Sequence, residues 1–216
     1  MTEVATVGVD RPARHPVHTV VGARIRALQH GVLKNQSDSV AALARLRRAV
    51  GKPTGSDPDV LQYTLHPDLA GPNPPDGPTQ AETATHLALT LYAVHQQALR
   101  EPMHREGREF GLGRSARRLV GGDEIPERHP VLRRFHMLGT SADLDELAHH
   151  LRGLVQQLRT ARIPLGYATL AEQLLWWQRA AGGPERVRLA WGRDFYFSQF
   201  KKNGNTTSES DSPEES

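Results

Sequence analysis

The chain of 216 residues contains no cysteine. Disulfide bonds and thiolate metal sites are therefore excluded, and the composition suits a reducing compartment. No apolar run approaches the roughly 20 residues of a membrane-spanning helix. The first 17 residues contain neither the apolar segment nor the cleavage pattern of a secretory signal. We therefore expect a soluble protein of the cytoplasm without a membrane partner.

Catalytic signatures are missing as well. The sequence has no HExxH zinc motif, no G-x-S-x-G nucleophile motif and no P-loop. His149 and His150 are adjacent and would diverge on a helix, and no pair of acids stands out as a general acid and base. For His86 and His95 a hydrogen-bonded core position is favoured over a ligand role. We expect no catalysis, no metal and no cofactor.

Positive charge is unevenly distributed along the chain. The net charge is +3, and arginine outnumbers lysine by 23 to 4. Residues 11–52 hold nine basic residues and one acid, whereas residues 209–216 hold four acids and no base. Arginine binds phosphate oxygens through a planar, bidentate fork. The asymmetry indicates a nucleic-acid partner, and a GC-rich genome is the other source of abundant arginine.

Apolar residues recur at helical spacing along most of the chain. The predicted helices cover residues 21–32, 40–50, 60–65, 79–99, 111–120, 131–138, 144–158 and 167–177. Residues 186–197 fit a short strand or irregular structure, and no other strand pattern is convincing. The sequence therefore predicts an all-α fold of two packed helical bundles with flexible termini. The expected divisions are a flexible arm over 1–16, bundles over 17–122 and 123–200, and a disordered acidic tail over 201–216.

Helix ends carry recognisable capping residues. Thr79 and Glu82 form a capping box at the start of the fourth predicted helix, whose middle is apolar on nearly all sides and therefore central. Ser37 or Ser39 is a candidate cap of the second helix, and Ser141 of the seventh.

The segment GLGRSARRLVGG, residues 111–122, carries three arginines and no acid. On a helix, Leu112, Ala116 and Leu119 share one face, and Arg114, Arg117 and Arg118 share the other. Gly111 and Gly113 lie at the helix N-terminus, where free backbone N–H groups attract phosphate. No acid lies four residues from these arginines, which favours a phosphate-binding face over a merely solvated one.

Further candidates are weaker. Arg24 comes from the first helix, and Arg133 and Arg134 come from the helix whose apolar side is Val131, Leu132, Phe135 and Leu138. Three tryptophans, Trp176, Trp177 and Trp191, either stack on bases or pack in the core, and their amphipathic setting favours the core. With so few aromatics, 6% of the chain, we expect contact with the nucleic-acid backbone without base readout.

Six segments in order resemble a known family. They read ALARLRRAVGKP, LALTLYAVHQQ, PMHREG, LGRSARRL, DELAHHLRGLVQQLR and WGRDFY. Together they are similar to the CasB family, the small subunit of the type I-E CRISPR surveillance complex called Cascade, over about residues 21–196. Gly166 departs from the family pattern, which has an aspartate there, and this weakens a local helix cap.

The resemblance implies a non-catalytic, all-α subunit present in two copies beside the guide RNA, the large subunit and the backbone subunits. It implies a basic surface that helps hold the guide–target duplex and the displaced DNA strand. The basic positions within matching motifs are Arg45, Arg47, Arg48, Arg105, Arg114, Arg117, Arg118, Arg152 and Arg193.

Two other functions stay open at this stage. A stand-alone DNA-binding regulator would need a recognition helix, and no tight helix-turn-helix spacing is present. A structural spacer would use the arginines to anchor neighbouring subunits. Sequence alone does not separate an arginine that meets phosphate from one that meets a neighbour's carboxylate.

Overall fold

The computed structural model describes residues 15–122 and 124–197. Within them the chain forms ten α-helices and no strand, apart from a single bridge between His104 and Leu165. The helices are α1 (Pro16–Leu33), α2 (Ser37–Arg48), α3 (Pro58–Thr64), α4 (Pro67–Ala70), α5 (Gln80–Gln96), α6 (Leu112–Val120), α7 (Pro130–Thr140), α8 (Leu144–Thr160), α9 (Tyr167–Trp177) and α10 (Gly183–Tyr196). A 3-10 turn, η1 (Arg108–Phe110), precedes α6. The all-α prediction is confirmed.

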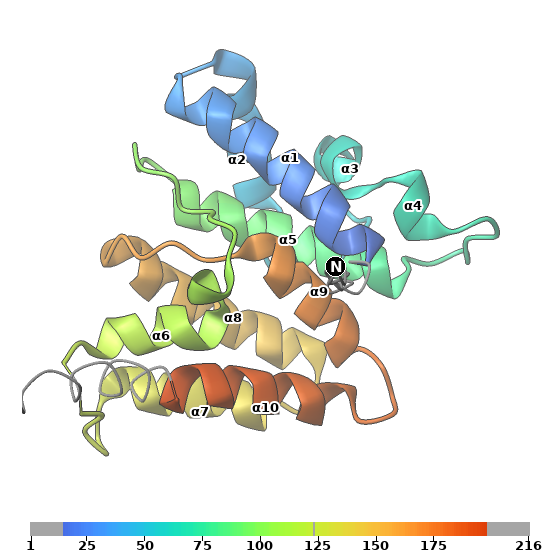
Figure 1. Cartoon of the computed structure of the whole chain (residues 1–216). Helices are drawn as coiled ribbons and strands as arrows, with labels where there is room; N and C mark the ends of the chain where they lie inside the picture. The colour runs from blue at the N-terminus through green and yellow to red at the C-terminus, as the bar shows by residue number, and fades with distance from the viewer. Residues whose placement is uncertain (1–14, 123, 198–216) are drawn as a thin grey trace, which may run out of the picture.

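Helix α5 lies at the centre of the molecule, as its apolar sequence predicts (Figure 1). Helices α1, α2, α3, α4, α8 and α9 all pack against it. The predicted capping box is present, because the Thr79 hydroxyl accepts from the Glu82 N–H and the Glu82 carboxylate accepts from the Thr79 N–H. This reciprocal cap sets where the central helix begins.

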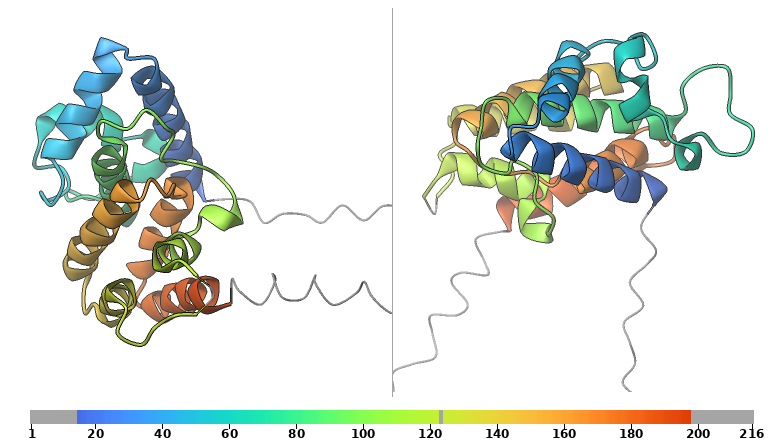
Figure 2. Two further views of the ribbon diagram at one scale, coloured as in Figure 1. Left: turned by 90° about the vertical axis from the view of Figure 1, so that its left-hand side faces the viewer. Right: turned by 90° about the horizontal axis from the view of Figure 1, so that it is seen from above.

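Helices α6, α7 and α10 form the side of the molecule opposite α2 and α3, as Figures 1 and 2 both show. Helix α9 connects the two sides, since it packs on α1 and α5 and also on α10. The buried apolar residues form one cluster that runs from Val17 to Phe195. The predicted division at residue 122 stays a prediction, and residues 1–14 and 201–216 of the predicted arm and tail lie outside the described residues.

Three local predictions are wrong. Residues 186–196 are helical and belong to α10. This helix begins at a glycine–proline pair, and Val187, Trp191 and Phe195 recur every four residues on its buried side. Ser141 does not cap α8. It is buried at the end of α7, where its hydroxyl donates to the Met137 carbonyl, and Asp143 caps α8 instead.

The start of α2 also differs from the prediction. The residue before the helix is Gln36, and neither predicted serine caps the helix with its side chain. Gly31 of α1 explains the arrangement, because a Cβ at this position would collide with the side chains of Ser39 and Gln36. The close approach of the two helices thus places Ser39 inside α2, facing α1.

The missing cap at Gly166 is confirmed, since no side chain caps α9 from that position. The Nδ1 of His104 accepts from the Tyr167 N–H at 3.1 Å and so satisfies one of the free donors of the helix. A Cβ at Gly166 would lie 3.3 Å from the carbonyl oxygens of Arg105 and Phe110. The glycine therefore lets the loop before α6 run against the start of α9.

Two of the tryptophans occupy the core, as their spacing favours. Trp177 and Trp191 are buried and stacked with their ring centroids 5.9 Å apart, and the Trp191 indole donates to Gln173. Trp176 is half-buried, and the guanidinium groups of Arg179 and Arg186 lie over its ring. No described tryptophan therefore offers an open face for base stacking.

The buried histidine His95 makes stability depend on pH. Its Nδ1 lies 2.9 Å from the Tyr167 hydroxyl, as predicted for a hydrogen-bonded core residue. Burial lowers the pKa of His95 from 6.5 to about 4. Between these values the unfolded chain binds a proton that the native state does not, so stability is lost as the pH falls. We expect urea denaturation to report a loss on the order of 3 kcal/mol between pH 7 and pH 4.

A matched variant separates this effect from general acid denaturation. Burial lowers the pKa of His86 and His104 as well, so a slope will persist without His95. His95→Gln keeps a hydrogen-bonding group beside Tyr167 but does not titrate. Its loss of stability over the same pH range should be shallower, and an equally steep loss would contradict the assignment.

Candidate nucleic-acid interface

The predicted arginine helix α6 packs tightly on α10. Gly113 is buried against the α10 backbone, where a Cβ would collide with the carbonyl oxygen of Trp191. Its lack of a side chain therefore serves close packing of two helices. The predicted attraction of phosphate to the N–H groups at this end of α6 stays a prediction.

An internal carboxylate occupies the N-terminus of α6. Asp194 of α10 lies beside Gly111, and its Oδ1 accepts a hydrogen bond from the Arg114 Nε at 3.3 Å. The same oxygen lies 3.7 Å from the Arg108 Nε. The helix dipole and Arg114, predicted to attract phosphate, are thus neutralised by a residue 80 positions away in the chain.

The predicted outward direction of the α6 arginines is wrong for one of them. Arg117 is 6% exposed, and its guanidinium donates to the carbonyl oxygens of Gly121 and Gly122 just beyond the helix end. Arg118 is exposed, but it donates to the Glu109 carbonyl and lies over the Phe110 ring. The arginines of α6, the most cationic segment of the sequence, therefore mainly bind carbonyl groups of the loops on either side of the helix.

Several other predicted arginines also connect elements of the fold. Arg24 donates at 2.6 Å to the carbonyl oxygens of Gln62 and Leu65, which ties α1 to α3. Arg45 contacts the Tyr63 hydroxyl, Arg48 lies 3.9 Å from Asp59, and Arg134 packs on the α8 backbone at Gly153.

The remaining predicted arginines are unpaired. The side chains of Arg47, Arg133, Arg152 and Arg193 make no hydrogen bond or ion pair with a described residue. Arg105 is exposed and contacts only the Phe110 ring. These arginines do not lie together: Arg133 and Arg193 are on α7 and α10, whereas Arg47 and Arg152 are on α2 and α8.

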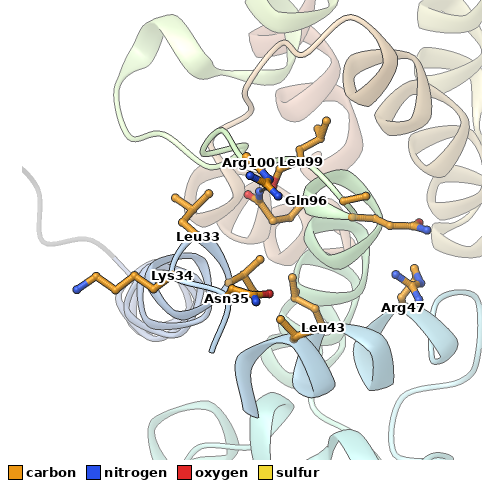
Figure 3. A pocket seen from close by; sticks show the side chains of 12 residues that line it. Leu33, Lys34, Asn35, Leu43, Arg47, Gln96, Leu99 and Arg100 are labelled. Atoms are coloured by element: carbon orange, nitrogen blue, oxygen red, sulfur yellow. Dashed lines mark hydrogen bonds between the residues drawn. The ribbon is translucent and has the colours of Figure 1, made fainter. Parts of the chain in front are cut away.

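Two clefts along α5 bring basic residues from different elements together. The first, about 480 Å³, lies between the ends of α1 and α5 and the side of α2, and it is lined by Lys34, Arg47 and Arg100 (Figure 3). The second, about 490 Å³, lies between the loop after α2 and α8, and it is lined by Lys52 and Arg152. We call these five residues the α2–α8 basic zone.

The basic zone differs from α6 in the state of its charges. Lys34, Arg47, Arg100 and Arg152 have no partner among the described residues. Lys52 pairs with Asp57 at 2.8 Å and holds the pKa of that carboxyl below its usual value. The second cleft also contains His149 and one acid, Asp145.

Sequence reasoning did not name three members of this zone as binding residues: Lys34, Lys52 and Arg100. Lys34 and Arg100 have one feature in common. Each follows the end of a helix, α1 or α5, and neither lies in an amphipathic repeat. The sequence offers one indication of these two residues: they lie beyond helix C-termini, where the helix dipole favours cations. It does not reveal that the two ends meet in space, since the residues are 66 positions apart.

The described helices set two further limits. None of them combines the length and apolarity that crossing a bilayer requires. Within residues 15–122 and 124–197, no three His, Asp or Glu side chains gather in a way that could hold a metal ion.

Residues 42–196 match the family model described as CRISPR-associated protein Cse2. The chain belongs to the Cse2 family. CasB from Thermobifida fusca is 40% identical, and the match covers 83% of this chain and 97% of that one with a TM-score of 0.71. The resemblance to the CasB family that the sequence motifs indicate is thereby confirmed.

More distant relatives share the fold. A Cse2-family CRISPR-associated protein from Thermus thermophilus is 23% identical, covers 86% of this chain and 100% of its own, and has a TM-score of 0.60. CasB of M. ruber is 22% identical, covers 85% of this chain and 98% of its own, and has a TM-score of 0.61. Comparison with curated proteins gave no match. The Cse2 fold therefore extends over nearly all of the described residues.

Proposed function

We propose that this Cse2-family chain is the non-catalytic small subunit of a CRISPR RNA-guided surveillance complex of the Cascade type. It binds the nucleic-acid backbone without sequence preference and stabilises the guide–target R-loop and the displaced DNA strand in antiviral defence. Its partners are the guide RNA, the target DNA, the large and backbone subunits and a second copy of itself. Family membership supports the complex, and the α2–α8 basic zone supports the contact with nucleic acid.

The observation that carries the proposal is the set of unpaired cations in the basic zone. An arginine that is paired with a carboxylate must lose that partner before it binds phosphate. Arg47, Arg100 and Arg152 have no carboxylate partner in the part of the chain that the structure describes. Sequence specificity in RNA-guided systems comes from base pairing, and protein contacts act on backbone and shape. R-loop formation is a nearly balanced exchange of duplexes, so backbone contacts of modest strength decide its lifetime.

The part of the proposal that concerns neighbouring subunits has separate support. Met137, Tyr196 and Phe197 are large apolar residues with 41–57% exposure, on α7 and at the end of α10. Exposed apolar side chains of this size are typical of surfaces that contact another protein. The spacer function left open by the sequence would use this surface and would not need the basic zone.

A salt titration of the purified chain tests the proposed function. Fluorescence anisotropy measures the affinity for labelled oligonucleotides of unrelated sequence. All duplexes should bind with one affinity, and all single strands should bind with one affinity. Five to six neutralised phosphates would lower affinity by roughly a thousandfold between 50 and 200 mM salt. A shallow salt dependence would favour the spacer, and a strong preference for one duplex sequence would favour the regulator.

A further inference from the structure

The first cleft of the basic zone combines features that the second lacks. Its lining residues include three cations and no carboxylate. Figure 3 shows Arg100 and Arg47 on different sides of the cleft, whereas the Lys34 side chain at its edge points away from the other labelled residues. Arg47 and Arg100 carry like charges at one hollow, and like charges repel one another in the absence of an anion. The charge pattern therefore fits a ligand with more than one negative group, such as successive phosphates.

The walls of this cleft are apolar and partly open. Leu33 and Val40 are 39% and 43% exposed, and Leu43 and Leu99 continue the wall between α2 and the end of α5. Leaving apolar groups in water is unfavourable by about 25 cal/mol per Å², and a flat apolar ligand would cover them. Sites for small organic ligands have this form, with apolar walls, a few polar groups and a volume of roughly 300–1,000 Å³.

Two amide side chains complete the lining. Asn35 and Gln97 have no side-chain partner among the described residues, so each offers a donor and an acceptor. The neighbouring Gln96 differs, because its amide already bonds the Leu99 and Glu101 carbonyls and the Met103 N–H. The free amides at the cleft suit the hydrogen-bonding edge of a planar ring.

We infer that this cleft takes one unpaired nucleotide of a single strand, with the base between the apolar walls and the flanking phosphates on Arg47 and Arg100. The inference rests on the proposed function and extends it, because backbone contact alone does not distinguish single strands from duplex. A base within a duplex is stacked and cannot enter. An acidic peptide would engage the cations but would leave the apolar walls in water, so the nucleotide fits better.

A variant that fills the cleft without changing charge tests the inference. Val40→Trp adds a bulky ring to an exposed helix position at the cleft wall, and Leu189→Trp is the control on exposed α10. The probes are labelled oligo-dT of 20 nucleotides, an abasic 20-mer with the same backbone, a 20-base-pair duplex and an octaglutamate peptide. A bound base contributes about tenfold in affinity, so wild type should bind oligo-dT about tenfold more tightly than the abasic strand.

In Val40→Trp this tenfold advantage of oligo-dT should disappear while duplex affinity stays unchanged, and Leu189→Trp should behave as wild type. Equal affinity of wild type for oligo-dT and the abasic strand would overturn the inference and leave the proposed backbone binding intact. Failure of wild type to bind any nucleic acid would overturn both. A third outcome is that Val40→Trp abolishes octaglutamate binding and leaves oligo-dT binding unchanged. This result would identify an acidic peptide as the ligand of the cleft and overturn the inference of a bound nucleotide.

Discussion

Replacing Arg47, Arg100 and Arg152 together by alanine is expected to lower nucleic-acid affinity about a hundredfold at 50 mM salt. Each side chain has no partner among residues 15–122 and 124–197, so its loss removes a phosphate contact without leaving one of these residues unsatisfied. The slope of log affinity against log salt should become shallower by about three units, one for each lost contact. Anisotropy titrations at several salt concentrations measure both quantities.

The control variant removes three arginines that lie outside the basic zone. Arg26 is paired with Glu106, and Arg179 and Arg186 cover Trp176. Replacing these three by alanine changes the net charge by the same −3 and should reduce the slope by less than one unit. If both triple variants weaken binding equally, net charge and not the basic zone determines affinity.

The same variant separates nucleic-acid contact from subunit anchoring in the assembled complex. If the three arginines meet phosphate, the variant should join the complex with guide RNA bound, and its R-loop should dissociate faster than that of wild type. Failure to join the complex before target DNA is added would identify the arginines as subunit anchors. A normal R-loop lifetime in a fully assembled complex would remove the basic zone from the proposed function.

Replacing Gly113 by alanine is expected to destabilise the fold by at least about 2 kcal/mol. Alanine favours a helix over glycine by about 1 kcal/mol, but here its Cβ collides with the Trp191 carbonyl, and overpacking against backbone costs about 3 kcal/mol or more, the upper end of its usual range. Helices α6 and α10 must move apart, which weakens the ion pair between Arg114 and Asp194. Thermal unfolding should show a melting temperature lower by about 4–8 °C.

Gly192 supplies the matched control on the partner helix. It lies within α10, and among the described residues no atom outside the adjoining turns of this helix lies within 4 Å of the position that a Cβ would take. Gly192→Ala should therefore stabilise the protein by about 0.5–1 kcal/mol through helix propensity alone. An increase in stability for Gly113→Ala as well would contradict the close packing of α6 on α10.

The helices themselves were predictable because their signals are local. Apolar spacing, the capping box at Thr79 and the continuous apolar run of α5 all act within a few turns of chain. The motifs that resemble the CasB family were sufficient to identify the Cse2 family. Residues 186–197 were the exception, since an apolar residue every fourth position, broken by Arg188, Gly192 and Arg193, fits more than one local structure.

The sequence by itself determined that the protein is helical, that arginine dominates its positive charge and that the chain resembles CasB. Only the tertiary structure decided which arginines are available. Arg114 has no acid within one helical turn, yet Asp194 neutralises it from another helix. Arg117 is oriented by carbonyl groups beyond the helix end, and Lys34 and Arg100 line the same cleft only because α1 and α5 both end there. Helical periodicity is a property of neighbouring residues, whereas the pairing of a charge depends on every group within a few ångströms, and folding brings those groups from distant parts of the chain.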